Sequence, residues 1–204
     1  LFSIKGLKVK KNTAIRLPSH FCGLLLVRLS GCSVEFLVFD YQRFGRTVKK
    51  FPGGMSTDGE IPFVDMVKTV RREAREEIGD PNLPESSQIE IMLPDEWLSQ
   101  RIVAEIDCSS TGNSEHWKYF FIVASDELKG EIRTQEINDS DTLLSTPRWI
   151  RAEDLYPIIF AGHLPAFVMG LKWLCDLSES LTANYSYIFK NVRVREIVSE
   201  QEKR

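Results

Sequence analysis

The sequence lacks the features that would assign it to several large classes of protein. Its four cysteines, Cys22, Cys32, Cys108 and Cys175, include no Cys-x-x-Cys pair and predict neither a zinc site nor a disulfide framework. No apolar run approaches the roughly 20 residues that a membrane-spanning helix needs. A net charge of −3 does not favour nucleic acid or an anionic membrane as the main partner. We therefore expect a protein of a reducing compartment, the cytoplasm, that binds a small molecule.

The order of the predicted elements indicates a mixed fold. The 204 residues hold enough apolar side chains for the core of one domain. Apolar runs predict strands at residues 20–29, 33–41, 102–106, 117–124 and 147–150. Helical periodicity predicts helices at residues 64–78 and 164–177, with loops over 43–54 and an irregular connection over 80–100. This order predicts an α+β (mixed α/β) fold over residues 1–178, followed by a C-terminal extension at 179–204.

The helix predicted at residues 64–78 ends in three glutamates, Glu73, Glu76 and Glu77. A helix C-terminus carries partial negative charge, and glutamates three or four residues apart repel each other on one face, so this arrangement lowers stability. On a wheel of 100° per residue the three carboxylates span roughly 100° of arc. Several carboxylate oxygens on one face are typical of a site for a divalent cation, which we predict here.

A glycine loop precedes this helix and points to a phosphate ligand. Gly53 and Gly54 have no side chains, so the backbone can approach a phosphate closely at this place. Arg72 stands four residues before Glu76 and is placed to hold its carboxylate. Cations beside a phosphate neutralise its oxygens and activate a water molecule. Together these residues indicate metal-assisted attack of water on a phosphate ester or anhydride.

The glycine loop and the acidic helix together match a known motif. Gly54, Glu60 and the run Arg72-Glu73-Ala74-Arg75-Glu76-Glu77-Ile78-Gly79 resemble the Nudix box. The box reads Gly, five residues, Glu, seven residues, Arg-Glu-aliphatic-x-Glu-Glu-x-Gly and a final aliphatic residue. Two features differ here: eleven residues separate Glu60 from Arg72, and Asp80 stands at the final position. Four extra residues are close to one helical turn, so an added turn at the start of the helix would nearly preserve the facing of the glutamates.

The resemblance covers about residues 18–178 and implies both a fold and a reaction. The implied fold is a Nudix-like α/β/α sandwich around a mixed β-sheet. The implied protein is a pyrophosphohydrolase that uses Mg²⁺ or Mn²⁺. By this resemblance Glu73, Glu76 and Glu77 are metal ligands, Arg72 orients a glutamate, and Gly54 is the loop glycine.

The catalytic base of the family is either a glutamate of the box or an acidic residue of a later loop. Glu76 and Glu77 are therefore candidates within the box. In the later loop Glu136 is the first candidate, with Asp139 and Asp141 behind it. Family members often form dimers, so a homodimer is a weaker expectation.

Several other residues have both a functional and an ordinary interpretation. Arg46, like Lys49 and Lys50, either contacts a substrate phosphate or belongs to a solvated basic loop. Glu60 is either part of the box or an acid favoured near a helix start by the helix dipole. For His116 and His163 a structural role is the better interpretation. Three tryptophans are expected in the core: Trp97, Trp149 and Trp173.

Three functions compete on this sequence. The first is hydrolysis of a nucleoside diphosphate derivative, with a nucleotide sugar such as ADP-ribose, a dinucleoside polyphosphate, a nucleoside triphosphate or a capped RNA end as substrate. The second is a non-hydrolytic nucleotide-binding regulatory module, which the four extra residues favour and the three glutamates disfavour. The third is isomerase chemistry on an isoprenoid diphosphate, for which no cysteine here has a catalytic context.

Overall fold

The computed structural model describes residues 19–30, 33–43, 45–61, 63–108, 116–139 and 142–180. The strands in these residues are β1 (Ser19–Ser30), β2 (Ser33–Arg43), β3 (Arg46–Lys50), β4 (Gly53–Met55), β5 (Glu90–Ile91), β6 (Ile102–Asp107), β7 (His116–Ala124), β8 (Leu128–Lys129), β9 (Ile137–Asp139), β10 (Thr142–Leu144) and β11 (Arg148–Arg151). The helices are α1 (Met66–Glu73), α2 (Asp95–Leu98), α3 (Ala152–Leu155) and α4 (Leu164–Ser180), and a π-helical turn over Ala74–Ile78 continues α1. Short 3₁₀ turns cover Glu85–Ser87, Ser99–Arg101, Ser125–Glu127 and Ala161–His163.

The main sheet is mixed and runs in the order β11-β2-β1-β7-β6. β1 and β7 are parallel over their full overlap, whereas the other pairs are antiparallel. One edge of β1 is shared by two partners, because β2 pairs with its C-terminal end and β4 with its N-terminal end. β2 leaves β1 to pair with β3, and the space beside β1 is taken by the glycine segment of β4.

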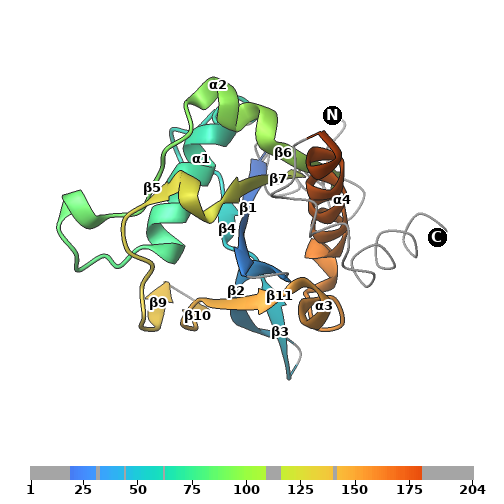
Figure 1. The fold of residues 1–204 in the computed structure, drawn as a ribbon. Coiled ribbons are helices and arrows are strands. Elements are labelled where there is room, and N and C mark those ends of the chain that lie inside the picture. Colours follow the sequence, from blue (N-terminus) through green and yellow to red (C-terminus); the bar gives the residue numbers. More distant parts are fainter. Residues whose placement is uncertain are drawn as a thin grey trace, which may run out of the picture.

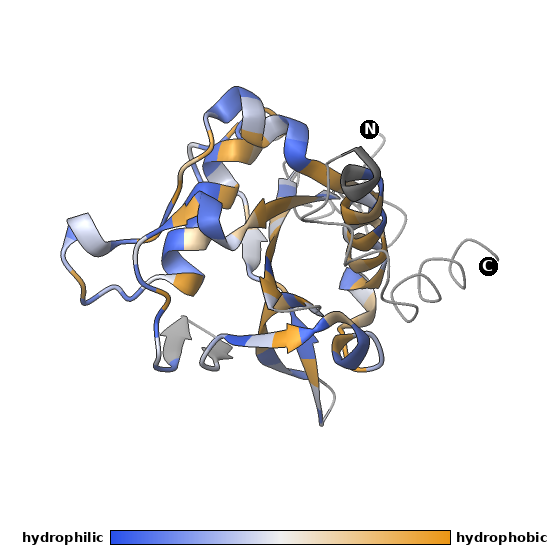
Figure 2. Cartoon of the chain, viewed as in Figure 1, coloured by the Kyte–Doolittle hydropathy of each residue, from blue (hydrophilic) through white to orange (hydrophobic). Residues whose placement is uncertain are grey.

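Alternation along the strands divides the core into two clusters, one on each face of the sheet. One cluster packs the sheet against α4 through residues such as Leu25, Phe36 and Phe167. The other packs it against α1 and the π-helical turn through residues such as Leu24, Val70 and Ile78. Figure 1 shows the sheet between α1 and α4, and Figure 2 shows hydrophobic residues concentrated on the central strands. This three-layer arrangement confirms the predicted α+β sandwich.

The structure corrects several local expectations. Residues 46–50, predicted as a basic loop, form β3, and Gly53 and Gly54 belong to β4. The helix predicted from residue 64 begins at Met66 and changes to π-helix after Glu73. Trp97, expected in the core, is 60% exposed on α2. Residues 1–18 and most of the predicted extension at 179–204 lie outside the described part of the chain.

The basic residues of β3 have tertiary partners that no local pattern reveals. The Lys49 side chain pairs with Asp40 across the strand, and its backbone N–H donates to the Ile158 carbonyl. Lys50 reaches Glu77 of the π-helical turn, 3.4 Å from nitrogen to oxygen. No helix in the described residues is long and apolar enough to cross a membrane.

His163 fixes the segment that leads into β4. It lies buried against Phe51, Phe120 and Phe160, and its Nδ1 accepts the backbone N–H of Phe51 at 3.1 Å. Burial lowers the pKa of His163 well below its usual range, and the positive charges of Lys50 and Lys118 lower it further. The structural role expected for this histidine therefore has a definite partner, the backbone just before the glycine loop.

Stability should fall with acid because of this histidine. Below pH about 6.5 the unfolded chain gains a proton on His163 that the folded chain does not bind, so the free energy of unfolding should fall by about 1.4 kcal/mol per pH unit from this residue. Urea unfolding at pH 7, 6 and 5 measures the slope. His163→Asn keeps an acceptor near the position of Nδ1 but cannot titrate, so its slope should be shallower than that of the native chain. Equal slopes would contradict this account.

Candidate active site

The candidate site lies where β4 and α1 meet on one face of the sheet. β4 is held on β1 by pairing of Gly54 with Cys22 and of Gly53 with Gly23. α1 packs on the same face because its buried side includes Val70, which belongs to the core cluster there. The three glutamates predicted as ligands follow at the end of this helix, so the fold brings the glycine loop and the acidic helix end together.

Glu73 lies directly against Gly54. A Cβ atom added at Gly54 would come within 2.4 Å of Glu73 Oε1, so the carboxylate would have to move from its place beside Arg72. Gly53 is restricted for a different reason, since its φ of +141° disfavours other residues and a Cβ would meet the Cys22 carbonyl at 2.3 Å. The two glycines are therefore required by the packing of a carboxylate and of a neighbouring strand.

Glu77 is the second buried carboxylate of the site. Its Oε2 accepts the backbone N–H of Gly53, and its Oε1 faces Lys50 Nζ at 3.4 Å. The π-helical turn directs Glu77 inward and Glu76 outward: their side chains are 7% and 56% exposed. Such turns within α-helices occur frequently at functional sites. The glutamates thus divide into two that are buried, Glu73 and Glu77, and one that solvent reaches.

Arg72 connects three carboxylates to one another. Its Nε donates to Glu60 at 3.1 Å, and its Nη1 donates to Glu73 and to Glu76 at 2.7 Å each. Its Nη2 also donates to the Met55 carbonyl of β4 at 2.7 Å. Although burial opposes charge, the bonds with Glu60 and the charge of Glu73 raise the pKa of Arg72. Arg72 therefore stays charged and holds the group together.

The four extra residues of the box do not form the added helical turn that we expected. A separate turn precedes α1, in which Val64 and Asp65 donate their N–H groups to the Ile61 carbonyl. Phe63 adopts a positive φ of 65° in this turn, which is strained for a residue with a side chain. Glu60 nevertheless meets Arg72, because the turn returns the chain to the start of the helix.

The charges of the site do not cancel. Four carboxylates, Glu60, Glu73, Glu76 and Glu77, are paired with two cations, Arg72 and Lys50, which leaves two negative charges when all are ionised. Burial would raise the pKa of Glu60, but donors from Arg72, Thr57 and Thr69 outweigh it and lower the pKa to about 2. Burial and the charge of Glu77 instead raise the pKa of Glu73 to about 7, against the pull of Arg72. Glu73 is therefore the carboxylate of the group that is least favoured as an anion without a further cation.

This excess fits a divalent cation in charge and in donor chemistry. Carboxylate oxygens are the ligands that Mg²⁺ and Mn²⁺ prefer, and one such ion would balance two negative charges. Within the described ranges, however, no three His, Cys, Asp or Glu side chains are already grouped so that they could hold a metal ion. Arg72 and Lys50 now contact the carboxylate oxygens, so these contacts would have to change when a metal ion binds.

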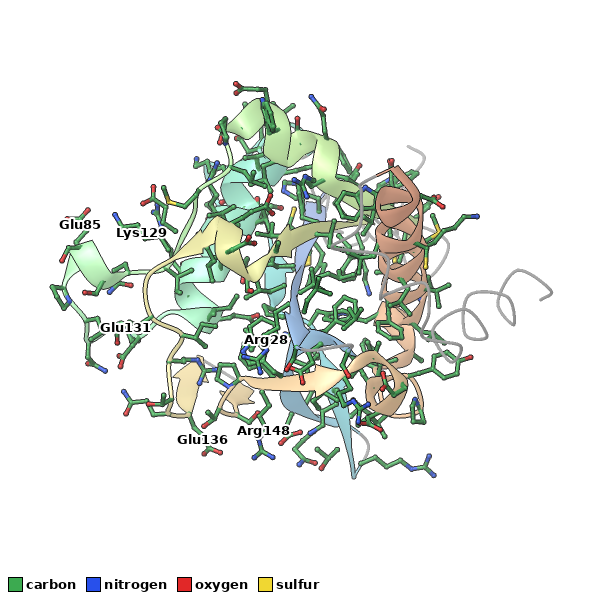
Figure 3. The ribbon with its side chains drawn as sticks, in the orientation of Figure 1. Arg28, Glu85, Lys129, Glu131, Glu136 and Arg148 are labelled. Carbon is green, nitrogen blue, oxygen red and sulfur yellow. The ribbon has the colours of Figure 1, made fainter. Side chains whose placement is uncertain are left out.

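Other predicted residues lie away from this group or outside the described part. Glu136 is exposed on the segment that leads into β9, and Figure 3 shows its side chain pointing away from the ribbon. Arg46 is exposed at the end of β3 opposite Lys50. The side chains of His116 and Asp139, and the whole of Asp141, are not among the described positions.

Arg133 is a residue of the site region that sequence reasoning missed. It is 2% exposed, its Nε donates to the Glu77 carbonyl at 2.7 Å, and its Nη2 donates to the Ser145 carbonyl at 2.9 Å. It therefore ties the end of the acidic helix to the later loop. Asp80, which stands at the final position of the box, makes a second link to that loop, because the Gln135 side chain donates to its carboxylate. Nothing in the local sequence around Arg133 indicates its burial.

Comparison with known proteins confirms the fold. The chain is similar in structure to the ORF135 protein of E. coli, at 13% identity over 82% of this chain and 96% of that chain, with a TM-score of 0.50. It is also similar to the NUDIX domain of Shewanella oneidensis NrtR in complex with ADP-ribose, at 13% identity, coverages of 78% and 90%, and a TM-score of 0.48. A third similar structure is that of an Ap4A hydrolase of C. elegans, at 17% identity over 77% of this chain and 98% of that chain, with a TM-score of 0.48. No protein-family model and no curated protein matches the chain. The likeness confirms the predicted fold, and at these identities it is one of fold alone.

The contact between Gly54 and Glu73 predicts a specific double-mutant result. Gly54→Ala should lower the free energy of unfolding by about 1–3 kcal/mol, because the new methyl group overlaps the Glu73 carboxylate. Glu73→Ala removes that carboxylate, so Gly54→Ala should cost much less in this background. Denaturant unfolding of the four proteins measures the coupling, and equal costs in the two backgrounds would refute the contact.

Proposed function

We propose that the chain is a metal-dependent hydrolase that cleaves a diphosphate linkage in a nucleoside diphosphate derivative by attack of water on phosphorus. The observation that carries the proposal is the burial of two neighbouring carboxylates, Glu73 and Glu77, directly against the glycine segment of β4. A folded protein has little reason to bury two neighbouring carboxylates in this way unless a cation joins them. The Nudix box and the fold support the same reaction.

Glu73 and Glu77 are the residues that would hold the cation, with Glu76 as the third, solvent-facing carboxylate. When bound, Mg²⁺ or Mn²⁺ supplies charge neutralisation of phosphate oxygens and a lowered pKa of water. Arg72 keeps Glu73 and Glu76 in a fixed relation, since one guanidinium nitrogen donates to both. Lys50 is a cation at the edge of the site, where it pairs with Glu77. If the Lys50 side chain moved away from Glu77, its charge could neutralise a substrate phosphate.

The backbone of Gly53 and Gly54 remains the proposed contact for a substrate phosphate. Arg46 is a more distant candidate for the same role. The base that removes the proton from water is either a glutamate of the box or Glu136 of the later loop. Glu76 is the box carboxylate with open access to solvent. The homodimer expected from the resemblance stays a prediction.

The proposed substrates follow the chemistry of the site and the printed names of similar structures, one bound to ADP-ribose and one an Ap4A hydrolase. The panel is a nucleotide sugar such as ADP-ribose, a dinucleoside polyphosphate and a nucleoside triphosphate, each with Mg²⁺ and with Mn²⁺. Release of phosphate or nucleoside monophosphate from at least one member, lost with a chelator, is the expected result. No release from any member would contradict the proposal.

A second function is favoured by one observation. In the described residues no three carboxylates are already grouped for a metal ion, and Arg72 and Lys50 contact one oxygen each of Glu73 and Glu77. This suits a nucleotide-binding regulatory module without hydrolysis. Tight binding of a nucleotide together with no turnover of the panel would identify that function.

Metal binding should depend on Glu73. Mg²⁺ or Mn²⁺ should raise the melting temperature of the native protein, because a ligand that binds only the folded state stabilises it. Glu73→Gln removes the charge that the cation would balance, so the stabilisation by metal should be largely lost, while stability without metal stays equal or rises. Glu85→Gln changes an exposed glutamate of the segment after the π-helical turn (Figure 3); it is the matched control and should respond to metal like the native protein.

Glu76 should matter for turnover and not for folding. Its side chain is half exposed and makes one ion pair on the helix surface, so Glu76→Gln should change the free energy of unfolding by less than about 1 kcal/mol. Loss of a carboxylate that contacts metal or water should lower kcat by roughly a hundredfold or more. Steady-state kinetics beside urea unfolding separate these effects. An unfolded variant would show that Glu76 is structural.

Substitution of two exposed glutamates tests whether the catalytic base lies in the later loop. If Glu136 is the base, Glu136→Gln should lower kcat by roughly a hundredfold with little change in KM. Glu131→Gln, an exposed glutamate earlier in the same segment, should leave kcat unchanged. Equal kcat values for both variants would assign the base to the box instead.

A further inference from the structure

A buried histidine outside the box is hydrogen-bonded to it through one threonine. His20 lies on β1 with 0% exposure, and Thr69, also 0% exposed, lies on α1. His20 Nε2 and Thr69 Oγ1 are 2.8 Å apart, and Thr69 Oγ1 lies 3.0 Å from Glu60 Oε2. We propose that His20 and Thr69 are positioning residues, which fix Glu60 and through it Arg72. This inference rests on the proposed hydrolase function.

The direction of each hydrogen bond follows from one backbone group. The N–H of Phe63 points at His20 Nδ1 from 3.2 Å, and a backbone N–H can only donate. Nδ1 therefore carries no proton in this arrangement, and the ring proton is on Nε2. Nε2–H donates to Thr69 Oγ1, which leaves the threonine hydroxyl proton free to be donated onward.

The threonine hydroxyl has two acceptors within reach. One is Glu60 Oε2 at 3.0 Å, and the other is the Asp65 carbonyl one helical turn earlier at 3.1 Å. A bond to an ionised carboxylate is roughly twice as strong as one between neutral groups, so Glu60 is the favoured acceptor. The chain of donors thus runs from Phe63 through His20 and Thr69 to Glu60.

Glu60, held in place by Thr69, in turn fixes the position of the Arg72 guanidinium. Its Oε2 receives Thr69 and the backbone N–H of Thr57 at 2.9 Å, while its Oε1 receives Arg72 Nε at 3.1 Å. Arg72 Nη2 also lies 3.4 Å from Oε2, so the carboxylate is fixed with Oε1 facing Arg72 Nε. Arg72 is thereby oriented so that Nη1 meets Glu73 and Glu76. His20 and Thr69 thus act on the reacting groups through this series of contacts.

The ordinary interpretation, a core histidine satisfied by its neighbours, does not account for the strained turn. The extra residues between Glu60 and α1 include Phe63 with its positive φ, and this is the residue that donates to His20. Strained backbone persists where surrounding contacts determine it, and it clusters at functional sites. His20 therefore holds the inserted turn on one side and, through Thr69, the box glutamate on the other.

Two substitutions of Thr69 test the relay. Thr69→Val keeps the shape but removes the hydroxyl, so Glu60 loses a donor; we expect kcat to fall roughly tenfold with KM nearly unchanged. Thr69→Ser keeps the hydroxyl and should restore kcat. Ile122→Val, in the core cluster on the opposite face of the sheet, lowers stability by a similar amount and should leave kcat unchanged.

Two substitutions of His20 separate its nitrogen atoms. Glutamine places a donor near Nε2 and asparagine places an acceptor near Nδ1. His20→Gln should retain the bond to Thr69 and keep kcat near the native value. His20→Asn should retain the bond to Phe63, lose the bond to Thr69, and behave like Thr69→Val. Similar kcat values for the two variants would overturn the relay, as would the reverse order.

A readout without substrate keeps this test separate from the proposed function. The NMR signal of the Arg72 Nε proton reports its bond to Glu60 in the native protein. It should move and exchange faster with water in Thr69→Val and His20→Asn, and stay in place in Thr69→Ser, His20→Gln and Ile122→Val. An unmoved signal in Thr69→Val and His20→Asn refutes the relay even if the protein is a hydrolase. The expected pattern in a protein with no turnover would support the relay and refute only the hydrolase. If one Thr69 variant fails to fold, the His20 pair decides.

Discussion

The site depends on one close contact, that of the Glu73 carboxylate with a glycine that has no side chain. A Cβ at Gly54 would overlap this carboxylate, so the glycine lets Glu73 lie directly on the strand in its place beside Arg72. The fold supplies the approach because β2 leaves the edge of β1 and β4 takes its place. α1 packs on the same face through its apolar side, which sets Glu73 against β4. The position of the carboxylate is therefore a consequence of the sheet topology.

This contact also explains the electrostatics. A carboxylate buried beside Glu77 is destabilised as an anion, and the pKa of Glu73 is accordingly raised to about 7. Glu60 is buried as well, yet its pKa falls to about 2, because it receives three sets of donors. Arg72 binds both but cannot balance four carboxylates, even with Lys50. The burial of two neighbouring carboxylates within this group is the physical reason to expect a divalent cation at the pair.

Much of this was predictable from the sequence, because the period of apolar residues and the flanking glycines are local signals. The strands β1, β2, β6, β7 and β11, the helix α4 and the acidic end of α1 were all predicted close to their observed bounds. β3 was missed because its charged residues resemble a loop, whereas Lys49 faces Asp40 across the hairpin with β2 and Lys50 reaches Glu77, 27 residues away. Trp97 was misplaced because an aromatic residue in a polar connection carries no signal for which side faces solvent. The inserted turn was misjudged because helical spacing alone does not reveal that His20 binds it from another strand.

The measurement that tests the central claim most directly is a crystal structure of the protein soaked in Mn²⁺, with anomalous diffraction data. The account predicts an anomalous peak between the carboxylates of Glu73 and Glu77, with the Lys50 side chain moved away from Glu77. A clean anomalous map without a peak at this pair, and with the contacts of Arg72 and Lys50 unchanged, would contradict it.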